Sequence, residues 1–173
     1  MQNTMTDLDK YRARKDTFFK EHPGSPLTPQ QQAEFNGLRY FPEDETLRLE
    51  VSVERDSNRQ LVYFDTTGDT LQPYTRVGRF KFKVDEEIAE LTIFASDQGY
   101  FLPFVDAQAG KETYPAGRYL EPEPLDEHYF YIDFNLAYNP YCAYNEQWTC
   151  PLTPAENHLK IEIRAGERLF IGQ

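Results

Sequence analysis

From Thr46 onward apolar residues recur at every second position, and this alternation limits the fold more than any other feature of the chain. Successive side chains of a β-strand point to opposite faces of a sheet, so a period of two indicates a strand with one buried face. The first alternating segment places its apolar side chains at Leu47, Leu49, Val51 and Val53. The chain is therefore predicted to be mainly β.

Short polar turns separate the alternating segments that follow. These segments occupy residues 60–66, 79–84, 90–96 and 100–105. A short turn makes the two strands that it joins antiparallel. With two further strands expected at 128–135 and 159–164, the pattern predicts an antiparallel meander of about seven strands curled into a barrel. A two-sheet sandwich gives the same alternation and stays open as the alternative.

Two short helices are predicted before the first strand. From Asp7 to Glu21 aromatic and apolar residues recur at three-and-four spacing, which is typical of an amphipathic helix. Thr28 followed by Pro29 has the pattern of an N-cap and a first helical residue, and Gly37 marks the end of this second helix.

The 173 residues are predicted to form a single domain, because this length is typical of one hydrophobic core. Residues 1–42 make up the helical lead-in. Residues 46–173 make up the β-barrel-like body, which includes an irregular loop at 135–157.

The charge balance excludes several partners. The formal net charge is -11 at pH 7, so a nucleic acid would be repelled and no nucleic-acid partner is expected. The chain has no apolar run of about eighteen residues and no apolar signal core at its start, so no membrane association is expected and a cytoplasmic location is predicted. Phosphate-binding loops, dinucleotide glycine patterns and histidine-rich metal motifs are missing, so no cofactor and no metal are predicted.

Polar residues gather where two of the predicted strands end. Asp106, Tyr114 and Arg118 follow a strongly apolar strand. The planar guanidinium of Arg118 matches a carboxylate or phosphate of a ligand, although an internal ion pair to Asp106 or Asp133 is an equally good reading. On the later strand Asp133 and Asn135 share one face with tyrosines, a mixture found in small-molecule pockets; a solvated outer face is the alternative.

The irregular loop is rich in aromatic residues and asparagine. The residues of interest are Tyr138, Asn139, Tyr141, Tyr144 and Trp148. Asparagine side chains close turns and aromatic rings pack a loop onto a sheet, so this segment is expected to roof the pocket and to supply its walls.

Both cysteines, Cys142 and Cys150, lie in this loop with seven residues between them. Two zinc ligands from one turn have two to four residues between them, so the spacing of seven argues against a structural metal. A disulfide that closes the loop and a pair of reduced packing thiols both fit the sequence. A nucleophilic cysteine would need a positioned base, for which His128 and His158 are the available histidines.

Several motifs resemble an uncharacterised bacterial and archaeal family, the domain-of-unknown-function family 1684. They lie within residues 113–120, 133–144 and 163–167, which read TYPAGRYL, DFNLAYNPYCAY and IRAGE. Pro115 replaces the glycine, and His158 the arginine, that the family pattern has at these positions. The resemblance covers nearly the whole chain but implies no activity, substrate or catalytic residue.

Three functions follow from these residues. The leading hypothesis is a small-molecule-binding β-barrel protein in which Arg118 pairs with a polar or anionic ligand and Asp133 with Asn135 hydrogen-bonds it. The alternative is an acid–base enzyme with Asp106 or Asp133 as the general base and Arg118 in the same pocket. The second alternative is a protein-interaction or structural domain whose tyrosine-rich loop is the interface. The oligomeric state is not predicted.

Overall fold

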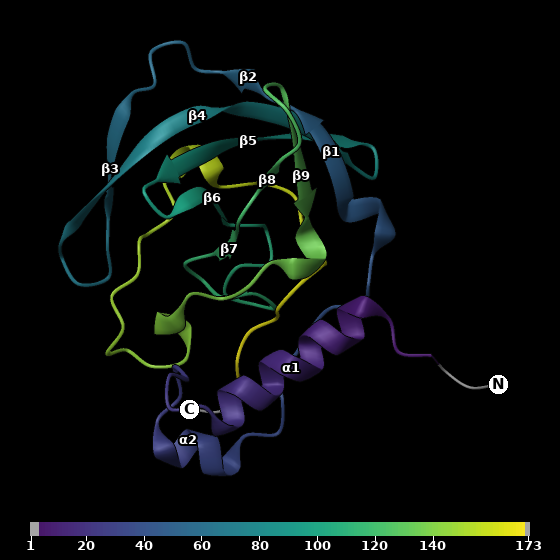
Figure 1. Ribbon diagram of the computed structural model, residues 1–173, viewed down its shortest axis with the longest axis vertical. Coiled ribbons are helices and arrows are strands. Elements are labelled where there is room, and N and C mark those ends of the chain that lie inside the picture. Colours follow the sequence, from purple (N-terminus) through teal and green to yellow (C-terminus); the bar gives the residue numbers. More distant parts are fainter. Residues whose placement is uncertain (1–3, 172–173) are drawn as a thin grey trace.

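Two antiparallel sheets form the body of the protein, and two helices lie below them in the view of Figure 1. The computed structural model describes residues 4–171. The smaller sheet has the strand order β1 (Arg48–Ser52), β9 (Tyr129–Asp133), β8 (Glu123–Pro124). The larger sheet has six strands: β2 (Glu54–Arg55), β3 (Leu61–Asp65), β4 (Leu71–Val84), β5 (Glu87–Ser96), β6 (Gly99–Phe104) and β7 (Arg118–Leu120).

One hydrophobic core joins the two sheets. Val51 and Phe130 face each other in the smaller sheet, and Phe80 and Leu91 do so in the larger one; all four are buried in the same cluster. Full burial of one such side chain contributes about 1.5–3 kcal/mol. The predicted mainly β, antiparallel fold is confirmed. A closed barrel is not, because the strands within residues 4–171 form two separate sheets.

The helical lead-in agrees with the prediction. Helix α1 spans Asp7–Glu21, and Thr6 caps it with a side-chain bond to the backbone N–H of Asp9. Helix α2 spans Pro29–Glu34 and is capped in the same way by Thr28. Both caps satisfy N–H groups that have no partner within the first turn of a helix. No helix within residues 4–171 is long and apolar enough to cross a membrane.

The prediction of a strand at 159–164 is wrong. This segment forms no strand. Its pairing with the residues after β6 is limited to a bridge between His158 and Val105 and to two backbone hydrogen bonds, from Leu159 to Val105 and from Ala107 to Ile161. The reason lies in its polar partners: the backbone N–H of Ile163 donates to Asp106, while the carbonyl groups of Ile163 and Ala165 accept from Arg118. Side chains take the hydrogen bonds that a neighbouring strand would otherwise make.

The predicted irregular loop at 135–157 contains only short 3₁₀ turns. These are η2 (Phe134–Leu136), η3 (Tyr141–Ala143) and η4 (Ala155–Asn157), and a further turn, η1 (Glu45–Leu47), precedes β1. Asn157 fixes the last of them, because its buried amide bonds the backbone of Thr92 in β5 and of Pro103 in β6. The loop therefore packs along the larger sheet.

Candidate functional site

Arg118 and Asp106 form a buried ion pair inside the core. Each side chain is 1% exposed, and the two charged groups are 3.7 Å apart. The guanidinium also donates to the carbonyl groups of Ile163, Ala165 and Glu167, while Asp106 accepts from Thr113 at 2.7 Å. Burial lowers the pKa of Arg118 to about 10, so the group stays charged at neutral pH. Arg118 is thus enclosed in the core, where Asp106 and three main-chain carbonyl groups are its partners.

Asp133 and Asn135 also have internal partners. The carboxylate of Asp133 accepts from Arg48 at 3.1 Å and from Asn135 at 2.9 Å. Asn135 is buried, and its amide bonds both the N–H and the carbonyl group of Asp44. Together they attach the segment before β1 to the end of β9. The amide of Asn135 thus has internal partners for both its oxygen and its nitrogen, and the carboxylate of Asp133 is paired with Arg48.

The middle of the irregular loop packs against the helices. Tyr144 packs edge-on against Phe19 of α1 and donates to the buried carboxylate of Glu167 at 2.8 Å. Burial and the charge of Glu167 raise the pKa of Tyr144. The backbone N–H of Asn139 donates to the same carboxylate at 2.6 Å, and Lys15 pairs with it at 3.3 Å.

The remaining loop residues extend this docked surface. Tyr141 lies between the rings of Phe19 and Trp148, and the indole N–H of Trp148 donates to the carbonyl group of Pro26. Tyr114 lies on another segment, with its hydroxyl 3.7 Å from the sulfur of Cys142. Cys142 and Cys150 are free thiols in the structure, which corresponds to the reduced pair and not to the disulfide.

A groove lies between α1 and the smaller sheet, and two of the predicted site residues, Asp133 and Tyr138, line it. Its volume is about 240 Å³. The polar lining consists of Tyr11, Glu121, Glu123, Tyr131, Asp133 and Tyr138. The apolar lining consists of Leu120, Pro122, Ile132 and Leu136. We call this feature the tyrosine groove.

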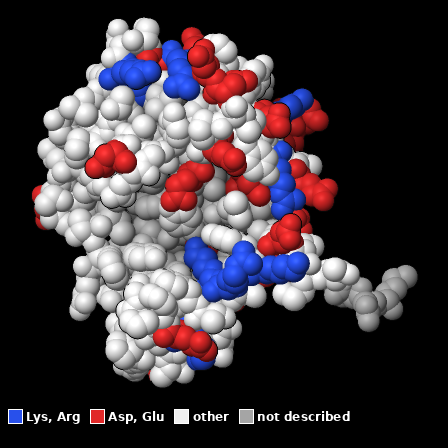
Figure 2. All heavy atoms as spheres, in the orientation of Figure 1, with Lys and Arg blue, Asp and Glu red and all other residues white. Residues whose placement is uncertain are grey.

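The tyrosine groove combines neutral phenols with negative charge. Tyr138 donates to the carboxylate of Glu121 at 2.6 Å, which orients both side chains. Burial is the main cause that raises the pKa values of Tyr11, Tyr131 and Tyr138, and nearby carboxylates raise them further, so these phenols stay protonated at neutral pH. On this face Figure 2 shows acidic side chains on the sheet side and Lys and Arg side chains along α1.

A cation of the protein already contacts this wall of aromatic rings. The ammonium group of Lys15 lies 5.0 Å from the ring centre of Tyr138. Arg48 pairs with Asp133 and Glu43 beside the groove. In contrast, Glu123 has no ion-pair partner anywhere in residues 4–171.

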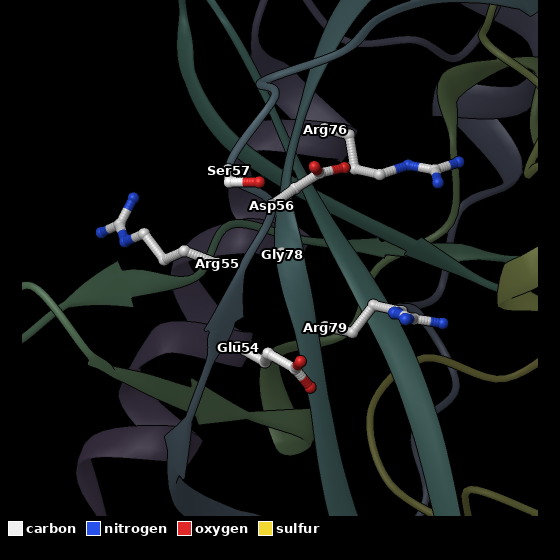
Figure 3. A pocket seen from close by; sticks show the side chains of 7 residues that line it. All are labelled: Glu54, Arg55, Asp56, Ser57, Arg76, Gly78 and Arg79. Carbon is white, nitrogen blue, oxygen red and sulfur yellow. The ribbon is translucent and has the colours of Figure 1, made fainter.

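A second hollow, beside β2 and β4, is rich in arginine but does not gather its charges. Its basic lining residues are Arg55, Arg76 and Arg79. Figure 3 shows Arg55 pointing away from the side on which Arg76 and Arg79 lie. Arg76 pairs with Glu156 and Arg79 with Glu90. An anion in this hollow would therefore not meet convergent guanidinium groups.

Sequence reasoning overlooked half of the polar lining of the tyrosine groove. Tyr131 was on the expected polar face of its strand, but Tyr11, Glu121 and Glu123 were not recognised. The Glu-Pro-Glu run at 121–123 was the available signal, since its carboxylates lie just after an apolar strand. Within residues 4–171 no cluster of three or more His, Cys, Asp or Glu side chains could hold a metal ion.

The fold and the groove define an antiparallel β protein with a helical N-terminus and a tyrosine- and carboxylate-lined surface site. A family described as Protein of unknown function (DUF1684) matches residues 33–168, and the chain belongs to this family, which confirms the resemblance seen in its motifs. A solution structure of an uncharacterised protein from Haloarcula marismortui is 38% identical, with a TM-score of 0.71 over 93% of this chain and 91% of that one. No curated protein matches the chain.

Proposed function

We propose that the protein binds a small organic cation, such as an amine or a guanidinium compound, in the tyrosine groove. The observation that carries the proposal is the convergence of three tyrosines and three carboxylates from α1, the 121–123 segment, β9 and the chain after β9 on one groove. Aromatic faces attract cations, and carboxylates supply the opposite charge. Lys15 makes the same kind of contact with the ring of Tyr138.

The sequence led us to expect an anionic ligand, because Arg118 was thought to pair with it. We now propose a cation instead. That guanidinium is enclosed and paired with Asp106 and main-chain carbonyl groups. The charge available at the groove is negative, and it comes from Glu121 and from Glu123. The net charge of -11 favours the approach of a cation over that of an anion.

The size of the groove limits the ligand. Pockets for drug-sized molecules have volumes of about 300–1,000 Å³. At about 240 Å³ the tyrosine groove fits a molecule with a short aliphatic chain and one or two charged ends. Putrescine and agmatine are therefore suitable probes, and succinate is a control of similar length and opposite charge.

Isothermal titration calorimetry with these three probes tests the proposal. Glu121→Gln combined with Glu123→Gln should weaken binding of agmatine about a hundredfold or more, because each of the two lost charge-assisted contacts is worth about 1.5–3 kcal/mol. Glu86→Gln combined with Glu87→Gln changes the charge equally at the turn before β5, outside the groove lining, and should leave binding unchanged. Equal binding of succinate, or no binding of either cation, contradicts the proposal.

A protein-interaction domain is the second candidate. Apolar side chains lie exposed on one face of the β3–β4 hairpin, where Leu61, Tyr63 and Leu71 keep 55%, 60% and 64% of their surface accessible. Under this second candidate function, the exposed apolar patch is the interface in place of the tyrosine-rich loop. Light scattering across a concentration series would support self-association if Tyr63→Ser lowered the observed mass.

The acid–base alternative has less support, since Asp106 and Asp133 are both paired with arginine. A cytoplasmic location remains part of the proposal. The free thiols are compatible with a reducing compartment.

A further inference from the structure

The two thiols of the irregular loop are neighbours, and neither lines the tyrosine groove. The backbone N–H of Cys142 donates to the sulfur of Cys150 at 3.3 Å. The sulfur of Cys150 therefore has a hydrogen-bond donor from the backbone of the residue that carries the second thiol.

The fold holds Cys150 in this position from outside the loop. Its backbone N–H donates to the hydroxyl of Thr67 at 3.0 Å, and its carbonyl group accepts from the backbone N–H of Thr67 at 3.0 Å. On the other side the sulfur of Cys142 contacts the hydroxyl of Tyr114. Both cysteines are buried, with 7% of their surface accessible.

The two thiols are not equivalent. The donors around Cys150, with the Cys142 thiol first among them, lower its pKa to about 7. The same contact and burial raise the pKa of Cys142. A thiolate, and not a thiol, is the nucleophile in disulfide exchange, so Cys150 is the group prepared to attack.

We propose that Cys150 and Cys142 form a reversible redox-active dithiol, in which Cys150 attacks an external disulfide and Cys142 resolves the mixed disulfide. Nothing in the groove proposal depends on this pair. The site takes a low-molecular-weight disulfide, for which glutathione disulfide is the probe.

The chemistry balances in two exchange steps. The thiolate of Cys150 attacks one sulfur of glutathione disulfide, a mixed disulfide forms, and one glutathione thiolate leaves and takes up a proton. Cys142 then loses its proton and attacks the sulfur of Cys150, which releases the second glutathione as a thiolate. The protein dithiol is oxidised to a disulfide, and one glutathione disulfide is reduced to two glutathione molecules.

Intact-mass spectrometry of the folded protein tests this assignment. After exposure to glutathione disulfide at pH 7, the wild type should lose two hydrogen atoms in mass and both free thiols, without forming dimers. Cys142→Ser should accumulate one glutathione on Cys150. Cys150→Ser should react about tenfold more slowly, because little of Cys142 is ionised at this pH.

Three results would overturn the proposal. One is a glutathione adduct that persists on the wild type. Another is faster reaction of Cys150→Ser than of Cys142→Ser. The third is a wild type whose thiols react only in urea, which would make them packing thiols. Circular dichroism checks the fold of each variant, and the corresponding alanine variants replace any serine variant that does not fold.

Discussion

The guanidinium of Arg118 is the largest polar group in the core, and its contacts explain why the core tolerates it. Two of its nitrogen atoms donate to carbonyl groups of the irregular 163–167 segment, and Asp106 supplies the opposite charge. A buried charge costs several kcal/mol unless it is paired and hydrogen-bonded. Arg118 and its partners are thus part of what fixes the C-terminal segment onto the sheet.

Arg118→Ala should therefore destabilise the protein by about 3–5 kcal/mol, since it leaves the Asp106 carboxylate buried without its counter-charge. Urea denaturation followed by circular dichroism measures this loss. Arg164→Ala is the matched control: its side chain is 53% exposed and pairs with Glu112 near the surface, so its cost should be about 0–1 kcal/mol. Equal costs for the two variants would contradict the role given to Arg118.

The residue types at these positions were predictable, but their roles were not. Asp106, Arg118, Asp133 and Asn135 have the side chains of a ligand site, and the sequence left the ion-pair reading of Arg118 open. The choice depends on partners that are distant in the chain, such as the carbonyl groups after residue 162 and the backbone of Asp44. The periodicity of apolar residues and the spacing of polar residues in the sequence carry no information about such contacts.

At the scale of elements, α1 buries one aromatic ring against the rest of the chain. Phe19 is 2% exposed and packs against Phe35 after α2 and against Tyr141 and Tyr144 of the loop. The salt bridge between Lys15 and Glu167 adds a polar contact one turn away. The docking of α1 forms one wall of the tyrosine groove.

Phe19→Ala should cost about 3–5 kcal/mol, because it removes a buried ring and leaves a cavity between α1 and the loop. Phe18→Ala, which removes a half-buried ring stacked on His22, should cost about 1–2 kcal/mol. Urea denaturation of both variants measures the difference. A loss for Phe18→Ala as large as that for Phe19→Ala would show that the helix is held differently.

Elements with local signals were predictable from the sequence. Thr28 and Pro29 define the start of α2 by themselves, and the alternation in 79–84 identifies part of β4. Residues 159–164 also have apolar residues at alternate positions, yet they form no strand. Asp106 and Arg118 take backbone hydrogen bonds there, and these side chains reach the segment only in the folded protein.

At the scale of the whole molecule, the stability of the fold at alkaline pH depends on the protonation of its buried tyrosines. Burial raises the pKa values of Tyr119, Tyr138 and Tyr144 in the folded state, whereas an unfolded tyrosine titrates at about 10. The folded state therefore holds these protons more tightly than the unfolded state. Their contribution to stability is complete below pH about 10 and is lost as the pH rises above that value.

The protein is thus expected to unfold cooperatively in alkali. Tyrosinate absorbance of the buried tyrosines should appear together with the loss of the circular dichroism signal. Complete titration of all tyrosines near pH 10 in a folded protein would contradict the burial described here.

The tyrosine groove is a property of the assembled molecule. Its polar lining comes from α1, from the 121–123 segment, and from β9 and the chain after it. The docking of α1 and the pairing of β1 with β9 bring these segments together. The strand face with Tyr131 and Asp133 was predictable from alternation. The contribution of Tyr11 was not, because it depends on how a helix lies against a sheet.

The most direct test of cation binding is a titration of ¹⁵N-labelled protein with agmatine, followed by amide chemical shifts and repeated with succinate. Saturable shifts for agmatine should cluster at Tyr11, Glu121, Glu123 and Tyr131, and succinate should leave these amides unchanged. Shifts that cluster at Tyr114 and Arg118 instead, or that follow succinate and not agmatine, would contradict the account and restore the anion site expected from the sequence.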